Sequence, residues 1–358
     1  VLNGTYPVNL DTQAVSAVMN DMTDYVSQLY METYGNDDTV ADVRAMCEEI
    51  RDVFRARIEA LDWMSDATKE MALRKLEAMD FYIGGPDASN AASALDEAAI
   101  LAPEDGGSYF ANAMAIRKAK LAADVQRGSM PVNVEQYVWQ GIGGTIADNW
   151  VYAPEVNAVI LPMAGLQAPV YDPIASEEEN LATLGITIAH EITHAFDSYG
   201  ANYDETGSLN NWWTEEDAAA FKAKTDILVK QFDAIEVLPA KDGQPAIMAN
   251  GSLSLGENIA DQGGLRVSHT AFRNSLNGTE PAPIDGFTAD QRFYLAYATL
   301  WAQNIRDEEI ARLTKLDVHS LGKWRVNATL RNLQDFYDAF SMTDGEMFMP
   351  EEERVVIW

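Results

Sequence analysis

The segment HEITHAFD, from His190 to Asp197, constrains the fold more than any other part of the chain. His190 and His194 are four residues apart, so an α-helix places their imidazoles on one face, one turn apart. Ser176 and Glu179 form a capping-box signal upstream of them. Apolar residues then follow at three- and four-residue spacing: Leu181, Leu184, Ile188, Ile192, Ala195 and Tyr199. The pattern predicts a helix that buries one face and presents the histidines and Asp197 on another.

The His-Glu-x-x-His spacing is typical of a catalytic zinc site, in which three protein ligands leave the fourth position to water. His190 and His194 are the expected ligands. Glu191 lies about 100° round the helix and reaches the water rather than the metal. We expect Glu191 to act as general base during attack of water on a peptide carbonyl, and to return the proton to the departing amine. The alternative is that all three are solvated polar positions on an amphipathic helix.

A third ligand is available in the segment from Gly256 to Asp261, which is predicted to be helical. Glu257 and Asp261 are one turn apart, so Glu257 can bind the metal while Asp261 accepts the free N–H of a ligand histidine. Asp197 can serve the other histidine in the same way. The alternative is that Glu257 and Asp261 are carboxylates favoured at a helix start by the macrodipole.

Two cationic side chains near the C-terminus are candidates for stabilising a developing oxyanion. His319 can hydrogen-bond the tetrahedral intermediate, and Arg325 can bind a substrate carbonyl or carboxylate bidentately. The alternative for both is an ordinary surface position. His269, the fourth histidine, has no such context and is interpreted as a packed or surface residue.

Charge and cysteine content restrict the classes of partner and of stabilisation. The 358 residues include 56 acidic and 25 basic side chains, a formal net charge of −31, which repels nucleic acid phosphates and anionic lipid surfaces. Cys47 is the only cysteine, so no intrachain disulfide forms. No apolar run reaches the roughly 18 residues of a membrane span. We therefore expect a soluble protein with no nucleic-acid partner.

The chain divides softly near residue 115. The first hundred residues have helical apolar spacing, and Ser65 or Asp66 is positioned to cap a helix that reaches Leu76. From Val132 to Tyr171 the sequence turns Gly-rich and β-branched, which predicts short strands or extended segments. Further helices are predicted from Glu215 to Ala234 after Thr214, from Asn258 to Asn274, and from Ala289 to Arg306 after Thr288.

Together, HEITHAFD, GENIADQGG, DVHSLGKWRV and the C-terminal Trp358 resemble the neprilysin family of zinc endopeptidases, through almost the whole chain. The resemblance implies a mainly α fold with a small β component, with a thermolysin-like zinc peptidase catalytic domain at 116–358 and part of a helical lid domain at 1–115. It also implies one Zn²⁺ per chain and cleavage of short peptides before large hydrophobic residues. By the resemblance, the zinc ligands are His190, His194 and Glu257, and Glu191 is the general base. Asp197 and Asp261 would support the ligand histidines. His319 would stabilise the transition state, and Arg325 would bind the substrate.

The family also binds the substrate backbone through an Asn-Ala pair upstream of the zinc helix. Asn157-Ala158 is one match, but counting back from Pro162 aligns the pair with Asn149-Trp150, so Asn149 is the predicted contact. Trp150 departs from the usual small residue. The positions that match the family's apolar specificity pocket are equally acceptable as core: Val170, Ile186, Leu300 and Trp301.

Two departures from the family bear on function. The cysteine of animal members near the C-terminal Trp is absent, which fits a disulfide-free bacterial protein, cytoplasmic or secreted. Family chains are close to twice this length, and the additional part is N-terminal. The alternative function is therefore a non-catalytic or assembly-dependent fragment that binds peptide or a partner chain and turns over only with a separate N-terminal half. An aminopeptidase would need an acidic group for a free amine, and no motif for one is visible.

Overall fold

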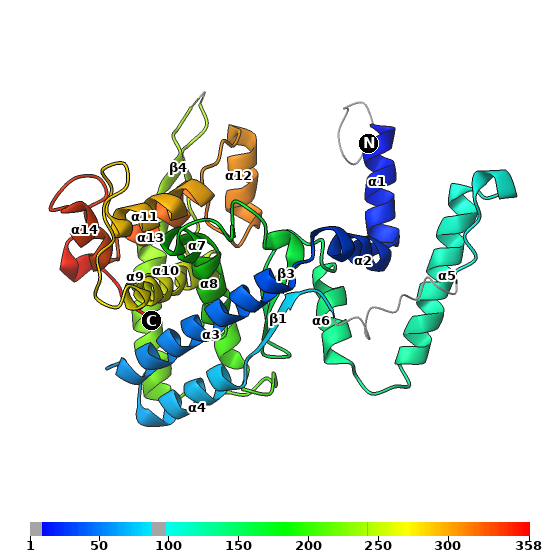
Figure 1. Cartoon of the computed structure of the whole chain (residues 1–358). Coiled ribbons are helices and arrows are strands. Elements are labelled where there is room, and N and C mark those ends of the chain that lie inside the picture. The colour runs from blue at the N-terminus through cyan, green and yellow to red at the C-terminus, as the bar shows by residue number, and fades with distance from the viewer. Residues whose placement is uncertain (1–8, 87–97, 242) are drawn as a thin grey trace. The chain divides into compact units, whose positions relative to one another are not determined.

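The computed structural model describes residues 9–86, 98–241 and 243–358, and it is mainly helical with short strands, as predicted (Figure 1). Two compact units interleave along the chain. Unit 1 comprises 1–40, 82–150 and 160–165, and unit 2 comprises 41–81, 151–159 and 166–358. Residue 115, the expected domain boundary, lies within a helix of unit 1, and the division into lid and catalytic domains stays a prediction.

Unit 1 is built from helices that bury few side chains. Its elements are α1 (Leu10–Asp21), α2 (Thr23–Tyr34), the start of α3 (Asp37–Ala60), a 3₁₀ turn (Pro103–Asp105), α5 (Tyr109–Arg127), α6 (Val134–Ile142) and a second 3₁₀ turn (Met163–Gly165). No residue of α1 is buried, and α5 buries only Ile116. The loop after α6 is tied to α2, because Thr145 N donates to Ser27 Oγ at 3.2 Å. Gly144 adopts φ +80° there, and an added Cβ would lie 2.3 Å from that Oγ.

The expectation of strands or extended chain from Val132 onward is wrong at α6. Asn133 caps this helix by accepting from Gln136 N, and Val138 and Trp139 are its buried residues. The cap signal of Asn133 therefore outweighed the local β-branched composition. The expectation is confirmed at β2 (Val151–Ala153) and β3 (Ala158–Pro162).

Unit 2 contains most of the core. Its elements are most of α3, α4 (Asp66–Glu77), β2, α7 (Glu177–Asn180), a π-helical turn (Leu181–Gly185), α8 (Ile186–His194), a 3₁₀ turn (Gly200–Asn202), α9 (Glu215–Asp233), β4 (Glu236–Leu238), β5 (Ile247–Met248), α10 (Leu255–Ser275), α11 (Ala289–Leu300), α12 (Asp307–Leu316), α13 (Gly322–Leu330), α14 (Gln334–Phe340) and a 3₁₀ turn (Glu351–Glu353). Of the two caps predicted for α4, Ser65 is the one observed, and the caps Thr214 and Thr288 are confirmed. The helix after Thr288 ends at Leu300, earlier than the predicted Arg306. Among the described residues, no helix is long and apolar enough to cross a membrane.

The strands are short and form two small sheets. The three-stranded sheet has the order β1-β3-β2, where β1 is Asp80–Gly84 and all five residues of central β3 are buried. Strands β1 and β3 each begin in unit 2 and end in unit 1. β4 and β5 pair antiparallel, with Glu236 opposite Met248.

The histidine-bearing helix starts as predicted and ends earlier. Ser176 and Glu179 form the capping box, and the chain continues through the π-helical turn into α8. α8 ends at His194, so Asp197 lies in the following turn and not on the helix. The reason is that Asp197 Oδ1 accepts from Tyr199 N at 2.7 Å and Gly200 N at 2.8 Å, which satisfies amides that a longer helix would use.

α8 packs directly against α10, and the two lie side by side in Figure 1. Gly263 and Gly264 of α10 lie tightly against α8. A Cβ on Gly263 would lie 2.4 Å from Thr193 Oγ1, and one on Gly264 would lie 2.8 Å from the carbonyl oxygen of Ile186 and 3.2 Å from His190 N. Only glycine therefore allows the backbones to approach this closely.

We predict that Gly264→Ala lowers the free energy of unfolding and weakens metal binding. Alanine gains about 1 kcal/mol of helix propensity over glycine, but overpacking against a main-chain carbonyl costs about 1–3 kcal/mol. Urea unfolding measures the first effect and chelator competition the second. Gly141→Ala in α6 is the matched control, because its Cβ would meet nothing within 4 Å and should stabilise slightly. A Gly264→Ala protein as stable as Gly141→Ala would contradict the packing argument.

Candidate functional site

Three donor atoms from α8 and α10 form a small triangle. His190 Nε2 lies 3.1 Å from His194 Nε2 and 3.2 Å from Glu257 Oε2, and His194 Nε2 lies 3.5 Å from the same oxygen. Zinc bonds of about 2.0–2.1 Å in tetrahedral geometry separate neighbouring donors by about 3.3 Å. The triangle therefore has the size and the donor types of one face of a zinc tetrahedron.

Glu191 is near this triangle but is held differently. Its carboxylate, with His190 and His194, offers candidate ligand atoms within 4.8 Å of one another. Its Oε2, however, accepts a hydrogen bond from Tyr152 N at 2.8 Å. Glu257 Oε2, at 3.2 and 3.5 Å from the two Nε2 atoms, has no such main-chain hydrogen bond among those of the described residues, so both carboxylates border the imidazole pair but are held differently.

Each histidine uses its other ring nitrogen to contact a carboxylate. His194 Nδ1 lies 2.7 Å from Asp197 Oδ2, and His190 Nδ1 lies 3.0 Å from Asp261 Oδ1. These contacts orient both rings with Nε2 toward the triangle, which is the usual arrangement behind metal-binding histidines. Asp197, in the turn after α8, and Asp261, one helical turn after Glu257 on α10, are thus equivalent partners of the two histidines.

Asp261 is itself paired with a buried cation. Arg325 donates from Nε at 2.9 Å and from Nη2 at 2.5 Å to the two carboxylate oxygens, and its guanidinium stacks 3.8 Å above the Trp301 ring. Burial raises the pKa of Asp261, but the charge of Arg325 and the His190 contact outweigh it, so the pKa is lowered overall. Asp261 is therefore ionised. The sequence did not reveal this role of Arg325.

The imidazoles and Glu257 also favour a charged arrangement. Burial lowers the pKa of His194, but its hydrogen bonds with Asp197 and Glu257 raise that pKa well above the usual value. Burial raises the pKa of Glu257, and the contacts with His190 and His194 more than reverse this. The triangle therefore has a high affinity for positive charge, which either protons or a metal ion can supply.

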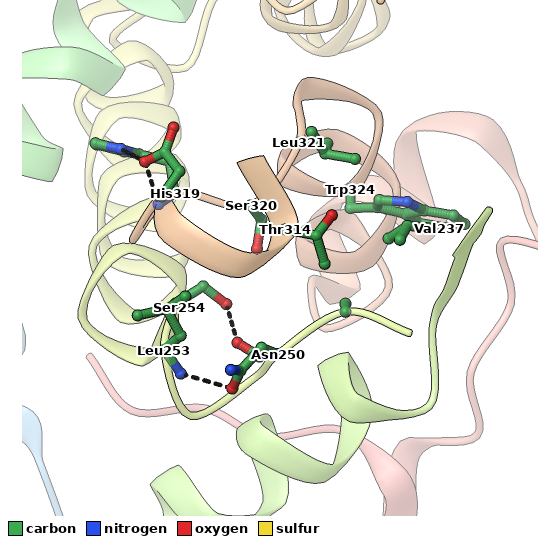
Figure 2. A pocket seen from close by; sticks show the side chains of 11 residues that line it. Val237, Asn250, Leu253, Ser254, Thr314, His319, Ser320, Leu321 and Trp324 are labelled. Carbon is green, nitrogen blue, oxygen red and sulfur yellow. Dashed lines mark hydrogen bonds and ion pairs between the residues drawn. The ribbon is translucent and has the colours of Figure 1, made fainter. Parts of the chain in front are cut away.

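His319 lies beside the triangle in a loop between α12 and α13. Its Nε2 is 3.3 Å from Glu257 Oε2, and its Nδ1 is 2.8 Å from Asp317 Oδ1. Ser320 Oγ donates to Asn258 Oδ1 at 2.8 Å, which ties the loop to α10 next to Glu257. Figure 2 shows the small pocket under this loop, lined by His319 and Ser320 and by residues of β4, α12, α13 and the chain before α10.

The remaining predicted residues are placed as follows. Asn149 is exposed in unit 1, directly before β2. Ile186 is buried in the first turn of α8, and Val170 is partly exposed, with its carbonyl accepting from Thr183 Oγ1 at 2.6 Å. The last two are at the end of α11: Leu300 and Trp301. None of the four apolar residues lines the pocket in Figure 2, and their assignment to substrate binding stays a prediction.

Three residues near the site were not among the site residues predicted from the sequence. Tyr152 acts through its main chain, which no side-chain pattern reports. Asn157, predicted to be the less functional asparagine, is 1% exposed and joins Tyr152 to α4. Lys75 is a buried cation in an amphipathic helix of ordinary composition. His269 is buried and bonded to Asp290, as expected for a packed residue.

Comparison with known proteins finds a family and several relatives. Models described as peptidase family M13 match residues 149–356 and 1–86. The neutral endopeptidase of Lactococcus lactis subsp. lactis is 32% identical over 344 residues, covering 94% of this chain and 51% of the relative. Membrane metallo-endopeptidase-like 1 of Mus musculus is 32% identical, covering 97% and 45%.

Solved structures agree with these matches. The Mycobacterium tuberculosis zinc metalloprotease Zmp1, in complex with an inhibitor, superposes with a TM-score of 0.84 at 32% identity, covering 97% of this chain and 51% of that one. PepO from Lactobacillus rhamnosus HN001 gives a TM-score of 0.76, also at 32% identity, covering 95% and 50%. The chain therefore spans about half the length of the relatives it matches.

We predict that Asp261→Ala weakens zinc binding about 10–100-fold, because His190 loses the partner that orients its ring. It also leaves Arg325 buried without its carboxylate, which costs about 3–5 kcal/mol of stability. The double variant Asp261→Ala/Arg325→Met should regain stability without regaining zinc affinity. Chelator competition and urea unfolding separate the two effects. Zinc affinity equal to wild type in Asp261→Ala would refute the orienting role.

Proposed function

Because the chain belongs to peptidase family M13, the neprilysin family, we propose that it is the catalytic part of a zinc-dependent endopeptidase. The proposed substrates are short peptides, cleaved on the amino side of large hydrophobic residues. The observation that carries the proposal is the triangle of His190, His194 and Glu257 with Glu191 beside it. Relatives named neutral endopeptidase and zinc metalloprotease support it.

In this proposal His190, His194 and Glu257 hold one Zn²⁺ per chain. When bound, zinc supplies acidification of a coordinated water and polarisation of the substrate carbonyl. Asp197 and Asp261 keep the two imidazoles in their binding orientation through Nδ1. The donor set fits zinc, because its nitrogen and carboxylate ligands and its spacing are those of catalytic zinc sites.

Glu191 performs the proton transfers. It takes a proton from the attacking water and returns it to the departing amine. The hydrogen bond from Tyr152 N engages Oε2 at 2.8 Å, which fixes the direction in which the carboxylate points. His319 is about half exposed beside Glu257, and it donates to the negative charge that develops on the carbonyl oxygen.

Substrate binding is assigned to six further residues. Arg325 binds a substrate carbonyl through Nη1, since Nε and Nη2 contact Asp261. Asn149 binds the substrate backbone. The large hydrophobic side chain of the substrate is assigned to the four apolar residues Val170, Ile186, Leu300 and Trp301. Residues 116–358 are the proposed catalytic domain, and 1–115 are part of a lid that excludes folded proteins.

A second candidate function is supported by the apolar surface of unit 1. Helices α1 and α5 expose large hydrophobic side chains: Leu10, Val15, Val18, Met19, Tyr109, Phe110, Met114, Leu121 and Val125. Soluble monomers seldom expose large apolar patches without an interaction to cover them. Because the chain spans about half of its relatives, a separate N-terminal polypeptide is the proposed cover, and turnover would then depend on assembly.

We predict that Glu191→Gln retains zinc and lowers the rate of peptide hydrolysis about 10²–10⁴-fold, because it removes the general base. The measurements are zinc content by atomic emission and cleavage of a peptide that contains phenylalanine or leucine. Glu177→Gln is the matched control, because Glu177 is exposed in the helix before α8 and should leave both quantities unchanged.

The wild-type chain distinguishes the two candidates. Zinc binding with hydrolysis supports the endopeptidase acting alone. Zinc binding with hydrolysis only after an N-terminal polypeptide is added supports the assembly-dependent function. A purified chain that binds no zinc would refute the proposal that it is a zinc-dependent enzyme.

A further inference from the structure

Lys75 on α4 is a buried cation that contacts the turn after α8, residues 195–203. The residue is 1% exposed, and its Nζ donates to three main-chain carbonyls, those of Ala195 at 2.8 Å, Gly200 at 2.7 Å and Tyr203 at 2.8 Å. Within the described residues no carboxylate lies at ion-pair distance from Lys75. Burial lowers its pKa to about 7, partly countered by the charges of Asp197 and Asp204. An apolar side chain of equal length would avoid this cost of burying an ammonium group.

The three carbonyls belong to the turn that supports His194. Ala195 directly follows His194, and its carbonyl is among those that the end of α8 leaves without an intrahelical partner. Gly200 and Tyr203 lie at the other end of the same turn. The Lys75 ammonium group therefore links the two ends of the segment 195–203 and closes the turn. Asp197 sits inside this closed turn, bonded to Gly200 N at 2.8 Å and to His194 Nδ1 at 2.7 Å.

A second path leads from Lys75 to Glu191. The main-chain carbonyl of Lys75 accepts from Asn157 Nδ2 at 2.9 Å, and Asn157 Oδ1 accepts from the Tyr152 hydroxyl at 2.9 Å. Tyr152 N in turn donates to Glu191 Oε2. Asn157 has φ +49°, a conformation in which Asn and Asp are favoured among non-glycine residues. One residue of α4 is therefore bonded to the supports of both a ligand histidine and the proposed base.

We propose that Lys75 is a positioning residue of the metal centre: it closes the turn 195–203 so that Asp197 holds His194 in its zinc-binding orientation, and through Asn157 it aligns Tyr152 with Glu191. The proposal rests on the proposed zinc site, and it adds a residue that touches neither metal nor substrate. The side-chain path acts on metal affinity, whereas the Asn157 path acts on the base. The two paths therefore predict different defects.

Lys75→Met removes the ammonium group and keeps an unbranched apolar chain about as long as the methylene stem of lysine. We expect zinc affinity to fall about 10–100-fold, the range typical for loss of an outer-sphere support. The absorption bands of the Co²⁺-substituted protein should also change, because His194 is free to reorient. Tyr152→Phe interrupts only the second path, so it should lower kcat with zinc affinity unchanged. Chelator competition, Co²⁺ spectra and steady-state kinetics measure these effects.

Two controls separate positioning from general stability. Lys69→Met changes a partly exposed lysine of the same helix, whose Nζ bonds to the carbonyl of Glu59, and should leave zinc affinity unchanged. Asp217→Asn disturbs a buried carboxylate that accepts from Ser65 and Thr68 at the start of α4, so it should lower Tm without affecting zinc. If Lys75→Met does not fold, Lys75→Gln, which is neutral but still a donor, takes its place in the comparison.

The outcomes are distinct. Weaker zinc binding and altered Co²⁺ spectra in the Lys75 variant, with both controls at wild-type affinity, support the proposal. A Lys75 variant that loses Tm like Asp217→Asn but keeps wild-type affinity and spectra overturns it, while the zinc site itself stands. A wild-type chain without zinc affinity overturns the proposed function and this inference together.

Discussion

The close contact of α8 and α10 is the interaction on which the rest of the site depends. His190 and His194 are on one helix and Glu257 is on the other, so the donor triangle exists only while the two backbones stay near van der Waals contact. Gly263 and Gly264 permit that distance, because any side chain there would meet Thr193 or the main chain of α8. Packing geometry, more than any single bond, therefore brings the three donor atoms together.

A second constraint is that the charges of the site are nearly all buried. Each imidazole is supported by a carboxylate, and each carboxylate is supported in turn. Asp261 is held directly by the guanidinium of Arg325, whereas Asp197 is held by main-chain amides of a turn that Lys75 closes. Buried charges of this kind add little net stability, but they restrict the orientation of the rings. Asp261 is thus fixed by an ion pair and Asp197 by main-chain hydrogen bonds, and each of them orients one histidine ring.

Sequence periodicity predicted the part of the site that depends on helical spacing. The histidines at four-residue spacing, the capping box at Ser176 and the pair Glu257 and Asp261 are all local patterns, and the structure brings those side chains together. α6 was missed because an Asn cap was read as part of an extended region. The end of α8 was misplaced because side-chain bonds of Asp197 stop the helix, which no apolar pattern reports.

The supporting residues could not be predicted for a related reason. Tyr152 acts through its main-chain N–H, and Lys75 binds carbonyls about 120 residues away along the chain. Such contacts depend on tertiary structure and have no composition or spacing of their own. Asn157 was set aside because counting back from Pro162 aligned the family's pair with Asn149, and its burial is visible only in the structure. Buried polar residues that bond to the main chain are therefore the class of site residue that a single sequence conceals most completely.

The position of the metal in zinc-soaked crystals tests the central claim most directly. We expect one anomalous peak at the zinc edge per chain, about 2.0–2.1 Å from His190 Nε2, His194 Nε2 and a carboxylate oxygen of Glu257, with Glu191 outside bonding distance of the metal. A peak coordinated by Glu191 in place of Glu257, or no peak at the triangle at saturating zinc, would contradict it.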